Sequence, residues 1–535
     1  TVLLRMTTPR MKALLGGTAF DAGSRTSIEL GAYRPTTRSP DAAILGDRNL
    51  TDPRVRDMER NSGLVYAAVD RKIDGTVGAS LRPQIKPNFR VLGITPEAAR
   101  ELGREMEAAW DVYANDPDFM CDAGRRLSLP AMARVEYWHW QVDGRAATVP
   151  LWLPRYGADY GTTFMSIDPT RISNPHDKPD SRYLRGGVEL DRYGAAVAYY
   201  VREQNPGDLL MADGKASFTW TRIPAYTRWG RRRMIYAFNQ RQAEQSQGRS
   251  PLLAALKKTR MLEKRDDLEL SAAAHLATFG MYVKSEVPSD ALFSMMSQAP
   301  TGGEASAADA VADLMAFTAA YYDRNAYLID GVAVPHLLPN EEIGTVSADR
   351  ANSDFTASQR QWMTYFGWSL GLTYEQVSGD FSKSAYVGIK AGFAVADRSM
   401  KADRKMFAGQ TQTPKLDLFL EEAFADGRIK VPAGAPSYED ARSAYLCVEW
   451  IGPGPISIDP TKEANAAATN METGRWTLEQ VLAEDGIDAE DQIAQLGREA
   501  KLREAAGLPP LGAMPVDPAA ADANADAQTD TGAPA

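Results

Sequence analysis

The sequence predicts an α+β protein with long helices, a β-rich middle section and a small inserted region. Three observations support this prediction. Residues 52–142 carry apolar side chains at helical spacing. From about 146 to 240, short β-prone runs alternate with Pro and Gly, which favours an antiparallel β domain. Three long helices then follow between Ser250 and Phe407, with two short strands between the first and the second.

Composition narrows the class of protein without identifying it. The chain has 535 residues, a formal net charge of −10 and 44% hydrophobic residues. These values are ordinary for a soluble globular protein of about three or four domains. The acidity does not indicate a general nucleic-acid binder. It is nevertheless compatible with a protein along which DNA slides, because each neutralised phosphate adds salt-sensitive affinity.

Other features of the sequence concern the cellular compartment. Cys121 and Cys447 are two isolated cysteines, which predicts buried free thiols in a reducing compartment. No apolar run reaches the ~18 residues of a membrane-spanning helix, and the N-terminus lacks the order of a signal peptide. We therefore expect a soluble protein that is not exported.

Residues 52–142 are expected to be mainly helical and to follow an N-terminal arm. Residues 1–50 are rich in Gly, Thr, Arg and Pro and predict a mobile arm. Residues 52–75 predict one helix. Thr95 before Pro96 predicts the N-cap and first position of the next helix. Residues 130–142 predict an aromatic-rich helix.

The remaining elements follow from local signals. A turn is predicted at 191–194, and Ser250-Pro251 predicts the start of a helix that runs to about 279. The other expectations are a helix at 307–322, strands at 326–328 and 332–334, a helix at 349–370, a Gly/Ser-rich loop at 371–384, a helix at 385–407, and a helical pair at 477–506 broken at 485–487. The tail from 507 contains mostly Ala, Asp, Pro, Gly and Thr and is predicted to be disordered.

Catalytic signatures are missing from the sequence. It contains no phosphate-binding Walker loop, no dinucleotide-binding glycine motif and no nucleophile elbow. The four histidines include no closely spaced pair, and neither cysteine has a cysteine neighbour, so we predict no metal site and no cofactor. Adjacent carboxylates such as Glu341 and Glu342 are typical of a solvated face. A carboxylate-metal nuclease site assembled from distant residues stays open as an alternative.

Basic residues recur at helical spacing in the last of the three long helices. Lys390, Arg398 and Lys401, with Arg404 or Lys405, fall on one face at about 100° per residue. The first long helix has a similar run of Lys257, Arg260, Lys264 and Arg265. Solvated helix faces explain such runs equally well. In a closed ring, however, one lysine per subunit becomes a circle of positive charge that contacts a phosphate backbone without reading bases.

Four segments together resemble a known family. Residues 371–386 read GLTYEQVSGDFSKSAY, which is similar to a segment of the lambda-type portal proteins of tailed bacteriophages. The other segments that resemble this family, in the family's order, are Arg60–Gly63 with Ala67–Asp70, Val77-Gly78 and Leu81–Pro83, then Gln247–Leu252, and Trp450-x-Gly452-Pro453 with Ile458–Ala464. The resemblance covers about residues 50–507.

The resemblance implies a portal fold with a β-rich wing, long stem helices, a small α/β clip, a tunnel loop with a channel-lining helix, a helical crown and a disordered C-terminal tail. The implied regions are an N-terminal arm (1–50), wing (51–249), stem helix (250–280), clip (281–348), stem helix (349–371), tunnel loop (372–385), channel-lining helix (386–409), C-terminal part of the wing (410–460), crown (461–506) and tail (507–535). Lys383 would be the tunnel-loop contact to DNA, with Lys390, Arg398 and Lys401 in or near the channel.

The implied function is structural rather than enzymatic. The family forms a homo-oligomeric ring, a dodecamer, at one capsid vertex, through which double-stranded DNA is packaged and ejected without sequence specificity. Implied partners are the major capsid protein, the terminase large subunit and a head-completion or adaptor protein. The implied location is the virion, with the host cytoplasm during assembly. The alternatives are a metal-dependent phage nuclease and a structural scaffold without a channel.

We predict that Lys383→Ala impairs DNA packaging or retention while leaving rings intact, because it removes one positive charge per subunit from the expected tunnel loop. The measurement is packaged DNA per particle, alongside electron microscopy of the purified variant. Loss of the ring itself would count against a role in contacting DNA.

Overall fold

The computed structural model describes residues 21–23, 27–205, 207, 218–278, 282–285, 316, 320, 326–329, 332–335, 341–344, 352–382, 385–456, 459–484 and 486–509. The described chain divides into two compact units. Unit 1 comprises residues 1–256 and 364–535, and unit 2 comprises residues 257–363. Four predictions lie wholly or almost wholly outside the described residues: most of the arm before residue 27, the helix at 307–322, Lys383 and the tail from 510.

Helices begin earlier in the chain than predicted. A 3-10 turn, η1 (Asp21–Gly23), is followed by α2 (Pro40–Leu45), α3 (Arg48–Asn61) and α4 (Gly63–Thr76). The part of the expected arm from residue 40 is thus helical, and Asp41 is buried there, where it accepts hydrogen bonds from Ser246 and Arg185. The single helix predicted for 52–75 is divided because Ser62 is extended, with φ −103° and ψ 111°.

The next helices confirm the capping signals. β1 (Arg82–Ile85) and α5 (Phe89–Leu92) precede α6 (Pro96–Ala114), whose N-cap Thr95 accepts a hydrogen bond from Ala98 N. Ser128 caps α7 (Leu129–Val142) in the same way. Both caps satisfy backbone donors that the first helical turn cannot pair internally.

An antiparallel β section follows, as predicted. β3 (Thr162–Ile167), β2 (Arg145–Trp152) and β8 (Ile235–Phe238) form a three-stranded sheet in that order. A four-stranded sheet has the order β4 (Leu184–Arg185), β5 (Val188–Leu190), β6 (Ala196–Arg202) and β7 (Trp220–Pro224), with the 3-10 turns η2 (Pro169–Arg171) and η3 (Pro175–Asp177) before it. The predicted turn at 191–194 joins β5 to β6, and Asp191 accepts the backbone N–H groups of Tyr193 and Ala195.

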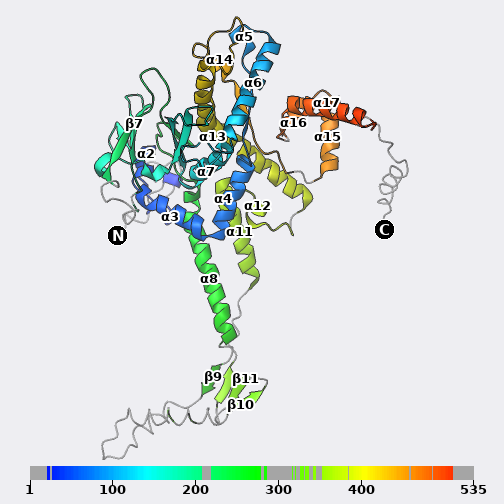
Figure 1. The fold of residues 1–535 in the computed structure, drawn as a ribbon. Helices are drawn as coiled ribbons and strands as arrows, with labels where there is room; N and C mark the ends of the chain where they lie inside the picture. The colour runs from blue at the N-terminus through cyan, green and yellow to red at the C-terminus, as the bar shows by residue number, and fades with distance from the viewer. Residues whose placement is uncertain are drawn as a thin grey trace, which may run out of the picture. The chain divides into compact units, whose positions relative to one another are not determined.

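Helix α13 (Tyr386–Ala425) packs against several other elements of unit 1. It is much longer than the helix predicted for residues 385–407 (Figure 1). It continues past Gly409 and through Pro414, two residue types that normally weaken a helix. Packing overrides that tendency, because the second half of α13 is almost wholly buried. Its apolar side chains join one core with α6, α7 and β3, and its middle joins a second core with α4 and α7.

A buried ion pair lies inside this arrangement. Lys415 of α13 is 2.7 Å and 2.8 Å from the two carboxylate oxygens of Glu136 on α7, and both side chains are at most 1% exposed. The carboxylate also accepts hydrogen bonds from Ser166 of β3 and Gln412 of α13. Helices and sheet are therefore joined at one charged group.

The long helix predicted from Ser250 begins as a 3-10 turn, η5 (Pro251–Ala254), with Ser250 as its N-cap, and continues as α8 (Leu256–Thr278). Unit 2 contains nearly all of α8 and the first part of α11 (Asn352–Leu370), which is the predicted helix at 349–370. Within unit 2, Lys258 lies over the ring of Trp362, 5.4 Å from its centroid. β9 (Tyr282–Ser285) pairs with β12 (Glu341–Gly344), and β10 (Ala326–Ile329) with β11 (Val332–Pro335), so the two predicted strands form a hairpin.

The C-terminal part of unit 1 pairs with an early strand of the chain. After α14 (Arg442–Tyr445), β13 (Val448–Ile451) pairs with β1. α15 (Pro460–Glu472), α16 (Leu478–Glu484) and α17 (Ala489–Ala505) follow, which confirms the predicted helical pair. The α16–α17 pair meets β1 and α6 mainly through polar contacts: Gln84 donates to Asp488 at 2.6 Å, and Arg104 pairs with Glu490 at 2.6 Å.

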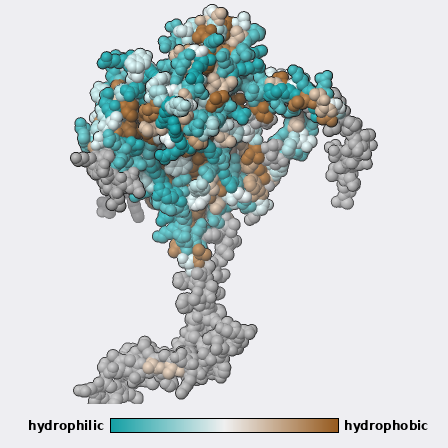
Figure 2. Space-filling view, viewed as in Figure 1, coloured by the Kyte–Doolittle hydropathy of each residue, from teal (hydrophilic) through white to brown (hydrophobic). Residues whose placement is uncertain are grey.

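The hydropathy of the surface and the burial of the two cysteines can be compared with the predictions. On the face shown in Figure 2, coloured side chains are mainly hydrophilic, with hydrophobic ones in small scattered patches, which is normal for a protein surface in water. Cys121 is buried as predicted, whereas Cys447 is exposed. Among the described helices, none is long and apolar enough to cross a membrane.

We predict that Lys415→Met lowers the free energy of unfolding by about 3–5 kcal/mol, because it leaves the Glu136 carboxylate buried without its cation. Adding Glu136→Gln should recover part of this loss, since the buried charge is then gone. Urea unfolding followed by tryptophan fluorescence measures both. Lys405→Met, at an exposed position of the same helix, is the control and should change stability by no more than about 0.5 kcal/mol. A Lys415→Met chain as stable as the control would contradict the prediction.

A second prediction concerns pH. Burial, together with the nearby carboxylates of Asp488, Asp491 and Glu490, raises the pKa of Glu107 on α6 from its usual 4.5 to about 7, although a hydrogen bond from Ile85 N acts in the opposite direction. A carboxyl with a raised pKa binds a proton on folding, so stability falls as pH rises from about 4.5 to 7. Glu107→Gln should remove this fall and stabilise the protein at pH 8, by at most about 1 kcal/mol after solvent screening. The measurement is thermal unfolding of both chains from about pH 4.5 to pH 8, with Glu105→Gln as control. Parallel pH profiles of the natural chain and the Glu107→Gln variant would refute the prediction.

Candidate nucleic-acid interface

The segment that carried the strongest sequence signal is a capped turn of helix rather than a loop throughout. Leu372 is buried and Thr373 begins a capping box with Gln376 at the start of α12 (Tyr374–Ser378). Gly379 ends α12 with φ +70°, a left-handed conformation that favours glycine. Arg71 of α4 donates to the carbonyl of Gln376 at 2.7 Å. The family-like motif thus packs against α4 through α12, and the described chain continues to Ser382, directly before Lys383.

The first half of α13 has an exposed face, which we call the open face. Its exposed residues are Val387, Ala391, Ala394, Val395, Arg398, Ala402, Lys405, Met406 and Gly409. Val387 and Val395 are 75% and 71% exposed. Arg398 and Lys405 are the charged residues of this face, and the structure gives neither of them an ion-pair partner among the described residues. The open face is therefore small, apolar and sparsely positive.

The other predicted basic residues have partners. Lys390 pairs with Glu463 of α15 at 3.1 Å, and Lys401 pairs with Asp397 one turn earlier at 3.0 Å. The hydrogen bond that Lys390 donates to the Glu463 carboxylate raises the pKa of Lys390. Lys390, Arg398 and Lys401 thus lie on one helix as predicted, but Arg398 alone among them is exposed with its charge unpaired within the described part of the chain. Whether these residues contact DNA stays a prediction.

Arg404 does not belong to an exposed stripe. It is 8% exposed and donates to the carbonyl oxygens of Thr76, Gly75 and Pro453, at 2.8, 3.1 and 2.9 Å. The first two carbonyls end α4, where a cation is stabilised by the helix dipole. Of the two alternatives Arg404 and Lys405, only Lys405 is exposed.

Several family-like residues pack against this arginine or close to it. A Cβ on Gly452 would lie 2.4 Å from Arg404 Nε, and a Cβ on Gly78, whose φ is +67°, would lie 2.8 Å from Pro453 Cδ. Trp450 donates its indole N–H to Thr413 at 2.9 Å. The motifs around residues 78 and 450 therefore hold α4, α13 and the C-terminal segment together.

The basic run of the first long helix is more evenly exposed. Lys257, Arg260 and Lys264 of α8 are exposed, and Arg260 pairs with Glu263 at 3.3 Å. Arg265 is partly buried and donates to Ser358 of α11. This run is consistent with the solvated face that sequence reasoning kept as an alternative.

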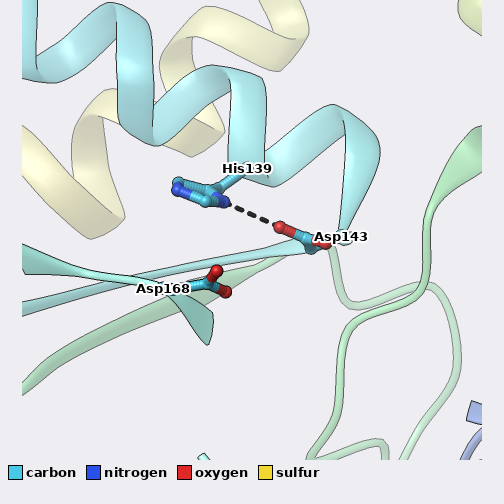
Figure 3. A group of neighbouring side chains, drawn as sticks. All are labelled: His139, Asp143 and Asp168. Carbon is cyan, nitrogen blue, oxygen red and sulfur yellow. Dashed lines mark hydrogen bonds and ion pairs between the residues drawn. The ribbon is translucent and has the colours of Figure 1, made fainter. Parts of the chain in front are cut away.

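One group of three metal-ligating side chains lies together in the described part of the chain, and Figure 3 shows it: His139, Asp143 and Asp168. The guanidinium of Arg56 already occupies this group, at 2.7 Å from Asp143 and 2.6 Å from Asp168. Burial alone would raise the pKa of Asp168, but hydrogen bonds from Arg56 lower it well below its usual range. The three side chains form a partly buried ion network in which Arg56 already supplies the cation, so they do not support the nuclease alternative.

Sequence reasoning missed two features. The first is the buried pair of Glu136 and Lys415, for which no local signal exists, since both residues look like ordinary surface charges. The second is the small, apolar character of the open face. The run of Val387, Ala391, Ala394 and Val395 at helical spacing would have indicated it, had the apolar positions been examined together with the basic ones.

Comparisons with known proteins agree with the resemblance. The family described as phage portal protein, lambda family, matches residues 27–404. The portal protein of Escherichia phage N15 is 29% identical over 484 residues, covering 90% of this chain and 89% of that protein. Portal protein B of Escherichia phage lambda is 29% identical over 517 residues, covering 94% and 95%. The chain belongs to the lambda family of phage portal proteins.

Solved structures give a weaker likeness. A chain from the neck of a native GTA particle, computed with C12 symmetry, is 10% identical and covers 87% of this chain and 99% of its own length, with a TM-score of 0.45. A chain from the neck of an empty GTA particle, computed with C6 symmetry, has a TM-score of 0.33.

Proposed function

We propose that this chain forms the portal ring at one vertex of a phage capsid, through which double-stranded DNA is packaged and later ejected. The observation that carries the proposal is the match to the lambda portal family over residues 27–404, together with relatives named portal proteins that align along nearly their whole length. The role is structural, and the ring is a dodecamer built by head-to-tail contacts that close on themselves.

The finer assignment follows the regions expected from the sequence. Unit 2, residues 257–363, encloses the expected clip and parts of both stem helices. The segment 371–382 and the open face of α13 are proposed to face the channel, with Lys383, Lys390, Arg398 and Lys401 in or near it. α15 to α17 form the crown. Terminase, the head-completion protein and the major capsid protein are the proposed partners, in the virion and, during assembly, in the host cytoplasm.

Physical chemistry supports the open face as a sliding surface. DNA carries a phosphate charge about every 1.7 Å of helix axis, and each phosphate that a protein neutralises adds salt-dependent affinity. A face with two unpaired cations among alanines and valines attracts the backbone without holding it firmly. A densely basic face would bind the backbone strongly and resist its movement.

Negative-stain electron microscopy of the purified chain tests the proposal. We expect rings with a central hole wide enough for duplex DNA. A stable monomer that cleaves DNA with a divalent metal would establish the nuclease alternative, and large assemblies without a pore would establish the scaffold alternative.

We predict that Arg398→Gln combined with Lys405→Gln leaves rings intact and changes the rate of DNA packaging, because it removes the unpaired charges of the open face. Packaging per particle is measured against Lys257→Gln/Lys264→Gln, which removes two exposed charges from α8. If the open-face variant fails to form rings while the control forms them, the open face is a contact between subunits and not a channel wall.

A further inference from the structure

The loop between β7 and β8 concentrates positive charge on an otherwise acidic protein. Residues 226–233 read YTRWGRRR, which we call the arginine hairpin. It carries four arginines and no carboxylate, whereas the whole chain has a net charge of −10. Trp229 lies at its tip and is 78% exposed, and Tyr226 is 48% exposed.

Backbone hydrogen bonds fix the conformation of the arginine hairpin. Thr227 N donates to Arg231 O at 2.7 Å, Gly230 N donates to Thr227 O at 3.1 Å, and Arg233 N donates to Ala225 O at 2.9 Å. Gly230 has φ +91°, which glycine adopts without strain. The side chains are therefore displayed from an ordered backbone, and less conformational entropy is lost when a ligand binds.

Three of the four guanidinium groups are available. Arg231 is engaged, since it pairs with Glu421 at 3.3 Å and donates to Thr162. Arg232 lies over the ring of Tyr226, 5.1 Å from its centroid, which leaves its N–H groups unused. Arg228 and Arg233 are exposed, and among the described residues no carboxylate lies within ion-pair distance of Arg228, Arg232 or Arg233.

The composition distinguishes between two kinds of anionic partner. The core of a protein–protein interface is depleted in charge around its aromatic anchors, whereas protein–DNA interfaces are polar and strongly positive. Here the neighbours of Trp229 are arginines and glycine. Guanidinium groups match phosphate oxygens two at a time, and the indole N–H adds one further donor. We propose that the arginine hairpin binds the sugar-phosphate backbone of double-stranded DNA.

This site is separate from the proposed channel face and goes beyond the proposed function. Arg231 anchors the hairpin to Glu421, near the end of α13, whereas Arg398 lies 23 positions earlier on the same helix. At 1.5 Å per residue, about 35 Å of helix separates the two positions. DNA bound at the hairpin is therefore a different segment from DNA at the open face.

Closed circular duplex DNA tests the proposal, because a circle cannot thread through a closed ring. Assembled full-length rings are mixed with a small double-stranded circle over about 50–200 mM salt. We expect binding by the natural chain. For Arg228→Gln/Arg233→Gln, we expect at least tenfold weaker binding and a salt slope smaller by about 2 for each hairpin engaged. The matched control is Lys257→Gln/Lys264→Gln, which removes two exposed charges from α8 and should bind the circle as the natural chain does.

Further measurements identify the class of partner and show whether the hairpin variant is folded. Trp229→Phe should remove the change in tryptophan fluorescence that the circle induces, while Trp368→Phe should keep it. Unchanged thermal unfolding and unchanged rings show that the hairpin variant is folded. Failure of the natural rings to bind the circle, or equal binding by the hairpin variant, overturns the proposal. Preferential binding of polyglutamate at the hairpin overturns it in favour of an acidic protein. Rings that package DNA in any of these cases leave the portal function standing.

Discussion

The burial of the second half of α13 is the constraint on which the rest of unit 1 depends, and the ion pair between Lys415 and Glu136 lies within it. Helices α7 and α13 and the three-stranded sheet meet at the Glu136 carboxylate, which contacts Lys415, Gln412 and Ser166. A buried charge is tolerated only where its partners satisfy it. The pair therefore adds little stability over an apolar contact, but it penalises any other register of helix against sheet.

Because the second half of α13 is held in this way, its first half can remain exposed. Arg404 lies at the transition, where it binds the final carbonyls of α4 and the carbonyl of Pro453. Beyond it, toward the N-terminus, α13 is supported by Leu372 and Val377 of the motif segment and by the pair of Lys390 with Glu463. A helix that is anchored at one end and sparsely charged at the other fits the proposed role of facing DNA in the channel.

Positively charged side chains occur in three different settings in this chain. Arg56, Arg404 and Lys415 are structural cations, each satisfied by carboxylates or carbonyls. Arg398 and Lys405 are isolated charges on an apolar face. The arginine hairpin gathers several unpaired charges at one turn. The net charge of −10 does not reveal these differences, because all three arrangements occur in the same chain.

The sequence by itself determined the class of fold, the helix starts at Thr95 and Ser250, the antiparallel β section and the family, because these depend on local capping, periodicity and motif order. It did not determine the break at Ser62, the length of α13 or the roles of individual basic residues. Local helix propensities predict that the helix ends near Gly409 and Pro414. It continues because Leu416, Phe419 and Leu420 are buried in the core. Lys390, Arg398, Lys401 and Arg404 look alike at helical spacing. Which of them is paired, buried or free depends on Glu463, Asp397 and the end of α4, and tertiary structure alone brings Glu463 and α4 to this helix.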